Sequence, residues 1–297
     1  MNENKMFKKA FDIADPSSLE AKVVSEDKFE YGDEPEYTPW DKFDPLEYTK
    51  RNYENMLPED KIIIKSVIQA MKKYGIKEGQ FENVADIGAG PNLYPSMLLA
   101  PYVKDKGKIS LIEYAVSNRE YLEKILGDDP QGEYLEHQQN WIKYGETIES
   151  MSDAKYEGIF EEVKNKVEIK AGSIYDLPRE EYSAVSSFFC AESITDKPEE
   201  FKKALDSLID SLKPGGIFIV AHMVGSEGYY AGEGTKFPAI NLTEEDLNRS
   251  YGSMESIADF HLERAEAGEG EKKAREGYHG MAVVIGRKKT AEEMTEN

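Results

Sequence analysis

The pattern of apolar and polar positions along the chain predicts helices and strands that alternate from residue 61 onward. Residues 61–74 carry apolar side chains at helical spacing and stop at Gly75, as expected of an amphipathic helix. A similar stripe runs from Phe201 to Leu212 and stops at Pro-Gly-Gly. Short apolar or alternating runs predict seven strands, at residues 84–87, 109–112, 167–170, 182–189, 217–221, 256–263 and 281–287.

Alternating strands and helices indicate a parallel sheet with helices on both faces. We therefore predict an α/β fold, with a Rossmann-like, seven-stranded, mostly parallel sheet and an N-terminal helical lid. Residues 61–290 are the expected domain, with a helical insertion at about 127–165 and a frayed tail at 291–297. Residues 1–60 are expected to form an arm and a lid, since their second half concentrates aromatic side chains. Thr243 is expected to cap a further helix, although Asp246 replaces the usual Glu or Gln of a capping box.

Composition narrows the classes of function that this chain can have. A net charge of −21 repels phosphate backbones, so we expect no nucleic-acid partner. No apolar run reaches the ~20 residues of a membrane span, and the start of the chain lacks the apolar stretch of a secretory signal. The single cysteine, Cys190, suits a reducing compartment. We expect a monomeric, cytoplasmic protein with no membrane partner. We also expect no metal, because the histidines lack the spacing of metal ligands.

The stretch NVADIGAGPNLY, residues 83–94, is typical of a strand, a glycine turn and a helix. Glycines at Gly88 and Gly90 let a ligand approach the backbone, and Pro91 is expected to occupy the first helical position. Glu113 follows the next strand, where a carboxylate can bind both hydroxyls of a ribose. A dinucleotide site requires a third glycine where this chain has Leu93, which argues against an NAD-dependent oxidoreductase.

The pattern Asp86-x-Gly88-x-Gly90 resembles the first motif of class I methyltransferases that use S-adenosylmethionine (AdoMet). In a parallel sheet, ligands bind outside the carboxyl ends of the strands. The groups that follow predicted strands are therefore expected to face one crevice. They are Gly88–Asn92, Glu113–Tyr114, Gly172–Ile174, Phe189–Glu192 and His222.

Four segments resemble the small-molecule N-methyltransferases that act on nicotinamide, phenylethanolamine and thioether or indolethylamine substrates. They are FDPLEYTKRNY at 43–53, ADIGAGPNLY at 85–94, EYAVSN at 113–118, and LKPGG with the later YYAGEGTKFPAINL. The resemblance implies AdoMet as cofactor, S-adenosylhomocysteine (AdoHcy) as product, and a small-molecule acceptor. It also implies that Tyr48 and Tyr53 close over the cofactor. The full set of residues that the resemblance assigns to cofactor contacts is Tyr48, Tyr53, Gly88, Ala89, Gly90, Pro91, Asn92, Tyr94, Glu113, Tyr114 and Asn118.

The acceptor half departs from the family pattern. His222 stands where relatives acting on nicotinamide carry an aspartate, and Pro238 and Ala239 stand where they carry serines. Ser173 replaces an acid before the adenine-contacting position, which is Ile174 here. Phe189 and Cys190 are expected to flank the cofactor. Tyr229, Tyr230 and Ala239 are expected to contact the acceptor, the tyrosines as an aromatic wall.

Methyl transfer to an amine requires an unprotonated nitrogen, so a base near neutral pH is useful. His222 is the first candidate for a catalytic base, and Glu192 is the second. The expected activity is methyl transfer from AdoMet to an amine or heteroaromatic nitrogen. An O- or S-methyltransferase, and a non-catalytic AdoMet-binding protein, are the alternatives that these residues leave open.

Overall fold

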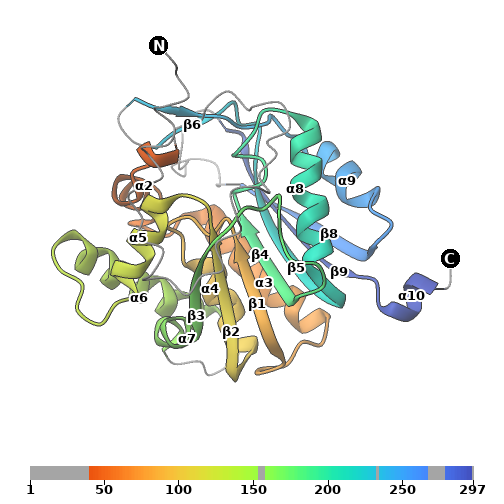
Figure 1. Ribbon diagram of the computed structural model, residues 1–297, viewed down its shortest axis with the longest axis horizontal. Coiled ribbons are helices and arrows are strands. Elements are labelled where there is room, and N and C mark those ends of the chain that lie inside the picture. The colour runs from red at the N-terminus through yellow and green to blue at the C-terminus, as the bar shows by residue number, and fades with distance from the viewer. Residues whose placement is uncertain (1–39, 153–157, 232–233, 267–277, 296–297) are drawn as a thin grey trace, which may run out of the picture. The chain divides into compact units, whose positions relative to one another are not determined.

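The seven predicted strands form one sheet in the order β3-β2-β1-β4-β5-β9-β8 (Figure 1). A computed structural model describes residues 40–152, 158–231, 234–266 and 278–295, all within the unit Tyr31–Asn297. β1 to β5 pair in parallel, and β9 runs antiparallel between β5 and β8. The bounds are β1 Phe81–Ile87, β2 Val103–Glu113, β3 Val167–Ala171, β4 Tyr182–Phe188, β5 Leu212–Val224, β8 Ile257–Ala265 and β9 Gly280–Lys288. The predicted fold class is confirmed.

The helices connect these strands and precede the first of them. Their bounds are α2 Pro45–Tyr53, α3 Pro58–Lys73, α4 Tyr94–Leu99, α5 Val116–Ile125, α6 Glu133–Met151, α7 Ile159–Lys166, α8 Pro198–Ser211, α9 Glu244–Gly252 and α10 Ala291–Thr295. Two 3₁₀ turns add η3, Trp40–Lys42, and η4, Ala100–Tyr102. A two-stranded hairpin joins β6, Tyr229–Tyr230, to β7, Lys236–Phe237.

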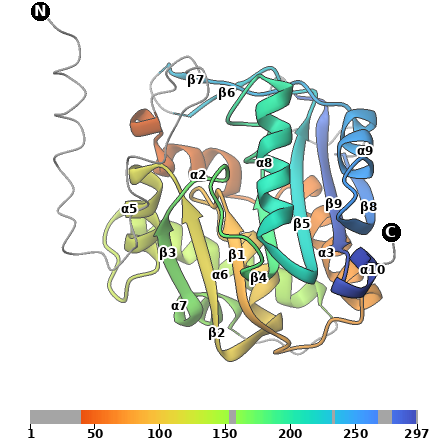
Figure 2. The same cartoon turned by 45° about the vertical axis from the view of Figure 1, so that its right-hand side comes forward.

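Alternate residues of the strands supply two cores, one on each face of the sheet. On β5, Ile217 and Ile219 pack with residues of α3 to α7, whereas Phe218 and Val220 pack with residues of α8 and α9. The labelled helices lie accordingly on the two sides of the sheet (Figure 2). Apolar alternation thus places one helical layer on each face.

Local sequence explains where several helices begin. Asp44 caps α2, because its carboxylate accepts hydrogen bonds from the backbone N–H groups of Leu46 and Glu47, both at 3.0 Å. Thr243 caps α9, and Asp246 returns a hydrogen bond by accepting from the Thr243 N–H at 3.0 Å. The short Asp side chain therefore completes the capping box that was expected to be imperfect.

Two predicted details differ from the structure. Pro91 does not open a helix, because α4 begins at Tyr94, and the amide of Asn92 donates to the Ala89 carbonyl within the turn. The tail is not frayed at 291–295, where α10 forms and Glu293 accepts two hydrogen bonds from Arg287, at 2.7 and 2.9 Å. The predicted arm at residues 1–39 lies outside the described residues.

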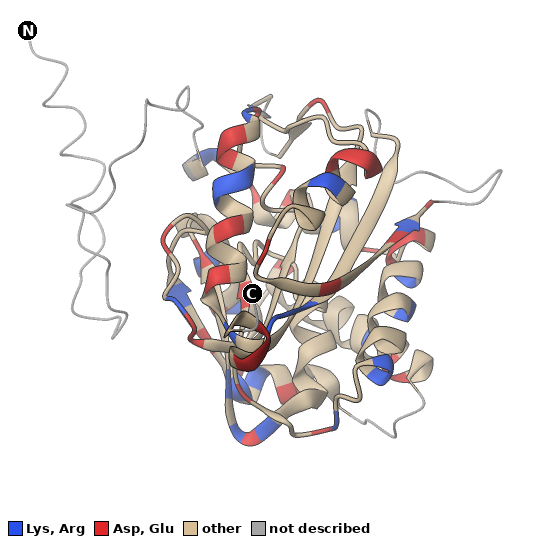
Figure 3. Cartoon of the chain, turned by 90° about the vertical axis from the view of Figure 1, so that its right-hand side faces the viewer, with Lys and Arg blue, Asp and Glu red and all other residues tan. Residues whose placement is uncertain are grey.

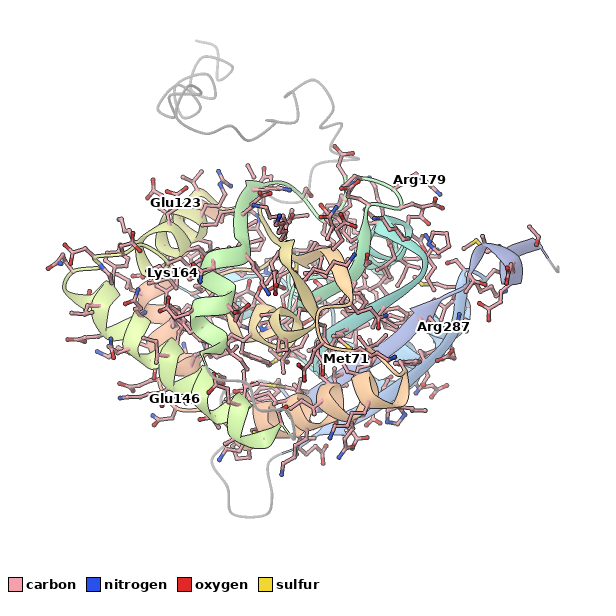
Figure 4. The ribbon with its side chains drawn as sticks, turned by 90° about the horizontal axis from the view of Figure 1, so that it is seen from below. Met71, Glu123, Glu146, Lys164, Arg179 and Arg287 are labelled. Carbon is pink, nitrogen blue, oxygen red and sulfur yellow. The ribbon has the colours of Figure 1, made fainter. Side chains whose placement is uncertain are left out.

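The expected helical insertion at 127–165 corresponds to α6 and α7. α6 buries Tyr144 and Ile148, and it exposes Glu146, which Figure 4 places on the outer side of the helix. On the face shown in Figure 3, Lys and Arg are interspersed with Asp and Glu along the ribbon. Among the described residues, no helix is both long enough and apolar enough to cross a bilayer.

Candidate active site

The carboxyl ends of the parallel strands meet at one edge of the sheet, and the strand order reverses between β1 and β4. From β1 the chain proceeds through β2 to β3 in one direction, and from β4 through β5 in the other. This reversal is the switch point at which open α/β sheets bind ligands. The groups predicted to follow the strands lie at this edge.

The glycine turn follows β1 and adopts a conformation that needs glycine. Gly88 and Gly90 have φ values of +63° and +57°. The amide of Gly88 donates to the carbonyl of Ile112 at 2.8 Å, which binds the turn to β2. A Cβ at Gly88 would lie 2.1 Å from Cys190 Sγ, so Gly88 also permits the chain after β4 to approach the turn.

Glu113 joins the glycine turn to the chain after β2. Its Oε2 accepts from Gly90 N and its Oε1 from Ala115 N, both at 2.7 Å. Burial raises the pKa of the Glu113 carboxyl, and these two backbone hydrogen bonds oppose the increase. Each carboxylate oxygen keeps a further lone pair, so Glu113 can accept additional hydrogen bonds from a ligand.

Asp86 fixes the base of the same turn. Its carboxylate accepts from the hydroxyls of Ser96 on α4, at 2.8 Å, and Ser186 on β4, at 2.9 Å. Burial raises the pKa of Asp86 to about 7, and the two serine hydrogen bonds oppose this shift. The Asp of the D-x-G-x-G pattern therefore ties β1 to the elements on either side of the switch point.

Buried polar atoms without a partner surround the turn and indicate that the site suits AdoMet. Asn92 Nδ2, beside the glycines, and Asn118 Oδ1, on α5, have no hydrogen-bond partner, although each residue is only 4% exposed. An amide N–H seeks an acceptor and an amide oxygen seeks a donor. The carboxylate and ammonium of the methionine part of AdoMet supply one of each, so these residues fit the cofactor.

Aromatic side chains of α2, the predicted lid helix, pack against residues that follow the glycine turn. Tyr53 is buried, with its ring centroid 5.5 Å from that of Trp141, on α6, and 6.1 Å from that of Tyr94. Tyr48 packs on Tyr53 at 6.1 Å. The amide of Asn140 on α6 donates to the Tyr53 carbonyl. The insertion therefore supports α2, a role that its sequence did not reveal.

The chain after β3 and β4 supplies the other residues predicted to contact the cofactor. Phe189 has a φ of +58°, a strained conformation for a residue other than glycine and one that concentrates at functional sites. Cys190 follows it, and burial raises the pKa of its thiol well above the usual range. Ile174 is buried, Ser173 Oγ accepts from Tyr175 N at 3.2 Å, and Tyr114 is 42% exposed.

His222 and Glu192, the two predicted catalytic residues, contact each other inside the protein. His222 Nδ1 lies 2.9 Å from Glu192 Oε2, and its Nε2 lies 2.8 Å from the hydroxyl of Tyr251 on α9. Glu192 Oε1 accepts from Met223 N and from Ser193 Oγ. Both side chains are fully buried. Neither ring nitrogen is free to take a proton from an acceptor, so this geometry argues for a positioning role, and catalysis by either residue stays a prediction.

The residues predicted to contact the acceptor divide between a packed cluster and an exposed tip. Tyr229 stacks on Phe237 with centroids 5.4 Å apart, and Phe237 also contacts Trp40 and Phe43, which precede α2. Ala239 is buried nearby in the chain, whereas Tyr230 is 55% exposed. The hairpin therefore packs against the segment that leads into the lid.

Sequence reasoning missed a second group of buried polar residues at the same edge. Glu59 and Asp60 lie in the first turn of α3 and are each 1% exposed. Adjacent acids in the first turn of a helix usually serve its dipole, so nothing in the local sequence distinguishes them. Only their hydrogen bonds in the folded protein distinguish these acids, because the partners Tyr144 and Tyr278 are distant in the sequence.

Comparisons with known proteins identify the family of the chain. A sequence model described as the NNMT/PNMT/TEMT family matches residues 33–289. Human phenylethanolamine N-methyltransferase is 24% identical over 231 residues, which cover 71% of this chain and 77% of that protein. The bovine enzyme of the same name is 22% identical over 229 residues, covering 71% and 76%. A solved Burkholderia thailandensis 1,6-didemethyltoxoflavin-N1-methyltransferase is 13% identical, covers 77% of this chain and 80% of that chain, and has a TM-score of 0.43.

Proposed function

This chain belongs to the NNMT/PNMT/TEMT family of AdoMet-dependent methyltransferases, and we propose that it transfers the methyl group of AdoMet to the nitrogen of a small-molecule amine. The observation that supports this proposal is the contact between the glycine turn and Glu113 at the switch point of the sheet, with Tyr53 of α2 packed on Tyr94 just after the turn. The names of the two mammalian relatives favour nitrogen as the atom that receives the methyl group.

The cofactor contacts follow from the positions of the predicted residues. The turn at Gly88, Ala89 and Gly90, with Pro91 and Asn92, would hold the methionine part, and Asn118 would donate or accept at the same end. Glu113 would bind the ribose through its remaining lone pairs. Ser173, Ile174, Phe189 and Cys190 come from the strands that flank β1 and β2 and would enclose the adenine.

When bound, AdoMet would supply a methyl group on a sulfonium sulfur, and the sulfur is the leaving group when a nitrogen lone pair attacks the methyl carbon in line. The chain must then place the acceptor on that line and exclude water, and positioning alone can supply much of the rate. The rings of Tyr48, Tyr53 and Tyr94 would perform this task, since they join the lid to the carboxyl end of β1.

His222 and Glu192 would act as positioning residues in this scheme. Their chain of hydrogen bonds connects β5, α9 and the segment after β4. The carbonyl of Glu192 also accepts from Ile240 N at 2.9 Å, which joins this chain to residues 229–242, the predicted acceptor loop. A phenol or thiol acceptor relies on a base more than a neutral amine does, and both His222 nitrogens are engaged. His222 therefore has no free nitrogen with which to take a proton from a phenol or a thiol.

The test has two parts. Calorimetry of the purified protein with AdoMet and AdoHcy should detect binding of both, and labelled AdoMet offered with amines, phenols and thiols should label amines. Labelling of phenols or thiols alone would refute N-methylation, and binding without labelling of any acceptor would indicate a non-catalytic protein. Gly88→Ala should abolish both cofactor binding and methyl transfer. Gly88 has a positive φ that alanine rarely adopts, and an added Cβ would collide with Cys190. Gly252→Ala, at a helical glycine with no atom within 4 Å, is the matched control.

A further inference from the structure

Two neighbouring carboxylates are buried beside the predicted lid helix α2, and the described part of the chain brings no cation to balance them. Glu59 and Asp60 begin α3 and are each 1% exposed. Across residues 40–152, 158–231, 234–266 and 278–295, no Lys, Arg or His nitrogen lies within 4.0 Å of either carboxylate. Burying an uncompensated charge is costly, so this pair requires an explanation beyond helix capping.

The hydrogen bonds made by the two acids leave an oxygen of each unused. Glu59 Oε1 accepts from the hydroxyl of Tyr278 at 3.2 Å, and Asp60 Oδ2 accepts from the hydroxyl of Tyr144 at 2.7 Å and from Leu57 N at 3.3 Å. Glu59 Oε2 and Asp60 Oδ1 have no partner. The buried hydroxyl of Tyr94 also lies close enough to Asp60 to interact with its carboxylate. The two carboxylate oxygens without a partner point to a ligand that donates hydrogen bonds.

The contacts of this cluster place it near the carboxyl ends of β4 and β5. Tyr94 follows the glycine turn, and its ring lies 5.1 Å from that of Phe188, the last residue of β4. Tyr278 lies two residues before β9, whose first residue, Gly280, pairs with Val224 at the carboxyl end of β5. Glu113 ends β2, on the other side of β1. The acids therefore lie at the carboxyl edge of the sheet, on the side of the glycine turn opposite to Glu113.

Aromatic rings form the walls of the same cluster. Tyr94 and Tyr144 stack with centroids 5.7 Å apart, and Tyr53 of the lid packs edge-on against both. Ring faces attract organic cations, and a desolvated site strengthens this attraction. Two carboxylates between tyrosine rings favour an ammonium group over a neutral heteroaromatic nitrogen.

We propose that Glu59 and Asp60 bind the ammonium group of an amine acceptor, so that the enzyme selects acceptors that carry a positive charge. This inference rests on the proposed function and names its substrate class. The nitrogen must lose a proton before it can attack. The proton passes from the ammonium to a carboxylate oxygen of Asp60, leaving a neutral amine and a carboxylic acid. The nitrogen lone pair then forms the N–C bond as the S–C bond breaks, the sulfur keeps its electron pair, and the product carries the positive charge.

Burial supports this role for Asp60. It raises the pKa of the Asp60 carboxyl to about 6. Hydrogen bonds from Tyr144, the Leu57 amide and Tyr94 oppose the shift, while the charge of Glu59 adds to it. A carboxylate with such a pKa is ionised at neutral pH, yet it accepts a proton more readily than an exposed aspartate does. Tyr94 and Tyr144, the other titratable groups that face Asp60, have hydroxyl pKa values well above the usual range.

The test compares charged and neutral probes on the full chain saturated with AdoHcy. Phenylethylamine, phenylethanolamine and benzylamine are titrated calorimetrically beside 2-phenylethanol and pyridine. At least one amine should bind, and Asp60→Asn and Glu59→Gln should each weaken it by at least about tenfold while leaving AdoHcy affinity within twofold. Glu146→Gln, on the exposed side of α6, removes a charge outside the site and serves as the matched control.

Turnover separates this inference from the proposed function. The two variants should raise the KM of the amine more than they change the KM of AdoMet, and Asp60→Asn should also alter the acidic limb of the kcat profile. Unchanged amine affinity in both variants, or binding of pyridine but of no amine, would overturn the ammonium site and leave N-methylation intact. Labelling of phenols without amines would instead overturn the proposed function itself.

Discussion

The proposed cofactor side and the proposed acceptor side of the site are built in different ways. On the cofactor side, the glycine turn and Glu113 come from one stretch of chain, and the Glu113 carboxylate accepts from the backbone amides of Gly90 and Ala115. On the acceptor side, Asp60 contacts Tyr144 across 84 positions of sequence, and Glu59 contacts Tyr278 across 219. The first side uses backbone geometry, and the second uses side chains that only the folded sheet brings together.

This difference shows which part of the enzyme can change its ligand. Replacing a side chain on the acceptor side alters recognition without touching the turn that holds the cofactor. Replacing a residue of the turn changes cofactor binding, and should therefore change the turnover of every acceptor to the same extent. Substitutions on each side test whether recognition of the cofactor can be separated from recognition of the acceptor.

Glu113→Ala should weaken AdoMet binding by about 1.5–3 kcal/mol, since it removes hydrogen bonds to a charged group. It also frees the amides of Gly90 and Ala115, so the turn itself should loosen. Calorimetric titration with AdoMet measures the effect, and thermal unfolding measures the loss of the two amide contacts. An unchanged dissociation constant would remove Glu113 from the ribose.

The cofactor side was largely predictable from sequence because its contacts are local. Gly88, Gly90 and Glu113 stand at spacings that only a strand, a turn and a second strand satisfy, and the structure places them together. The sheet was predictable for a similar reason, since apolar alternation marks each strand. The amino-terminal ends of the strands were harder to predict. β2 and β5 begin several residues earlier than expected, in stretches that lack apolar alternation.

The acceptor side was not predictable, because burial decides its chemistry. His222 has the residue type and the position of a base, but Tyr251 and Glu192 engage both nitrogens from other elements. Glu59 and Asp60 have the local sequence of ordinary first-turn acids, and only the packing of α6 and the chain before β9 buries them. No pattern within either segment records those distant partners.

Asp60→Asn should stabilise the protein without ligand, and the gain should grow with pH. Burial raises the Asp60 pKa from an ordinary 3.8 to about 6, so this group favours the folded state below pH 4 and loses that contribution as pH rises through 6. The difference between these two pKa values corresponds to about 3 kcal/mol at most. An amide does not titrate, so the stability difference from the native protein should widen between pH 4 and pH 8.

Chemical denaturation at several pH values measures that difference. Asp86, whose pKa burial raises to about 7, titrates in the same range in both proteins and cancels in the comparison. A difference that stays constant from pH 4 to pH 8 would contradict a buried, ionisable Asp60. Binding of an amine should reduce the gain, because the cation stabilises the carboxylate that the variant lacks.

Tyr251→Phe should cost about 1–1.5 kcal/mol of folding stability, because His222 Nε2 loses its partner inside the core. If His222 only positions the acceptor loop, the pH profile of kcat should keep its shape while the acceptor KM rises. Thermal unfolding and a pH series with the best acceptor test both statements. A displaced pH optimum would instead restore the interpretation of His222 as a base.

Tyr230→Ala should have the smallest effect and the most selective one. This side chain is 55% exposed at the tip of the hairpin, so its loss should change stability by less than about 0.5 kcal/mol. If its ring contacts the acceptor cation, the acceptor KM should rise about two- to fivefold, as a partly exposed cation–π contact of ~0.5–1 kcal/mol implies. Tyr230→Phe keeps the ring and should retain the native KM. Equal KM values for the Ala and Phe variants would show that the acceptor contacts end at the buried cluster, and that Glu59 and Asp60 recognise the cation without help from the hairpin tip.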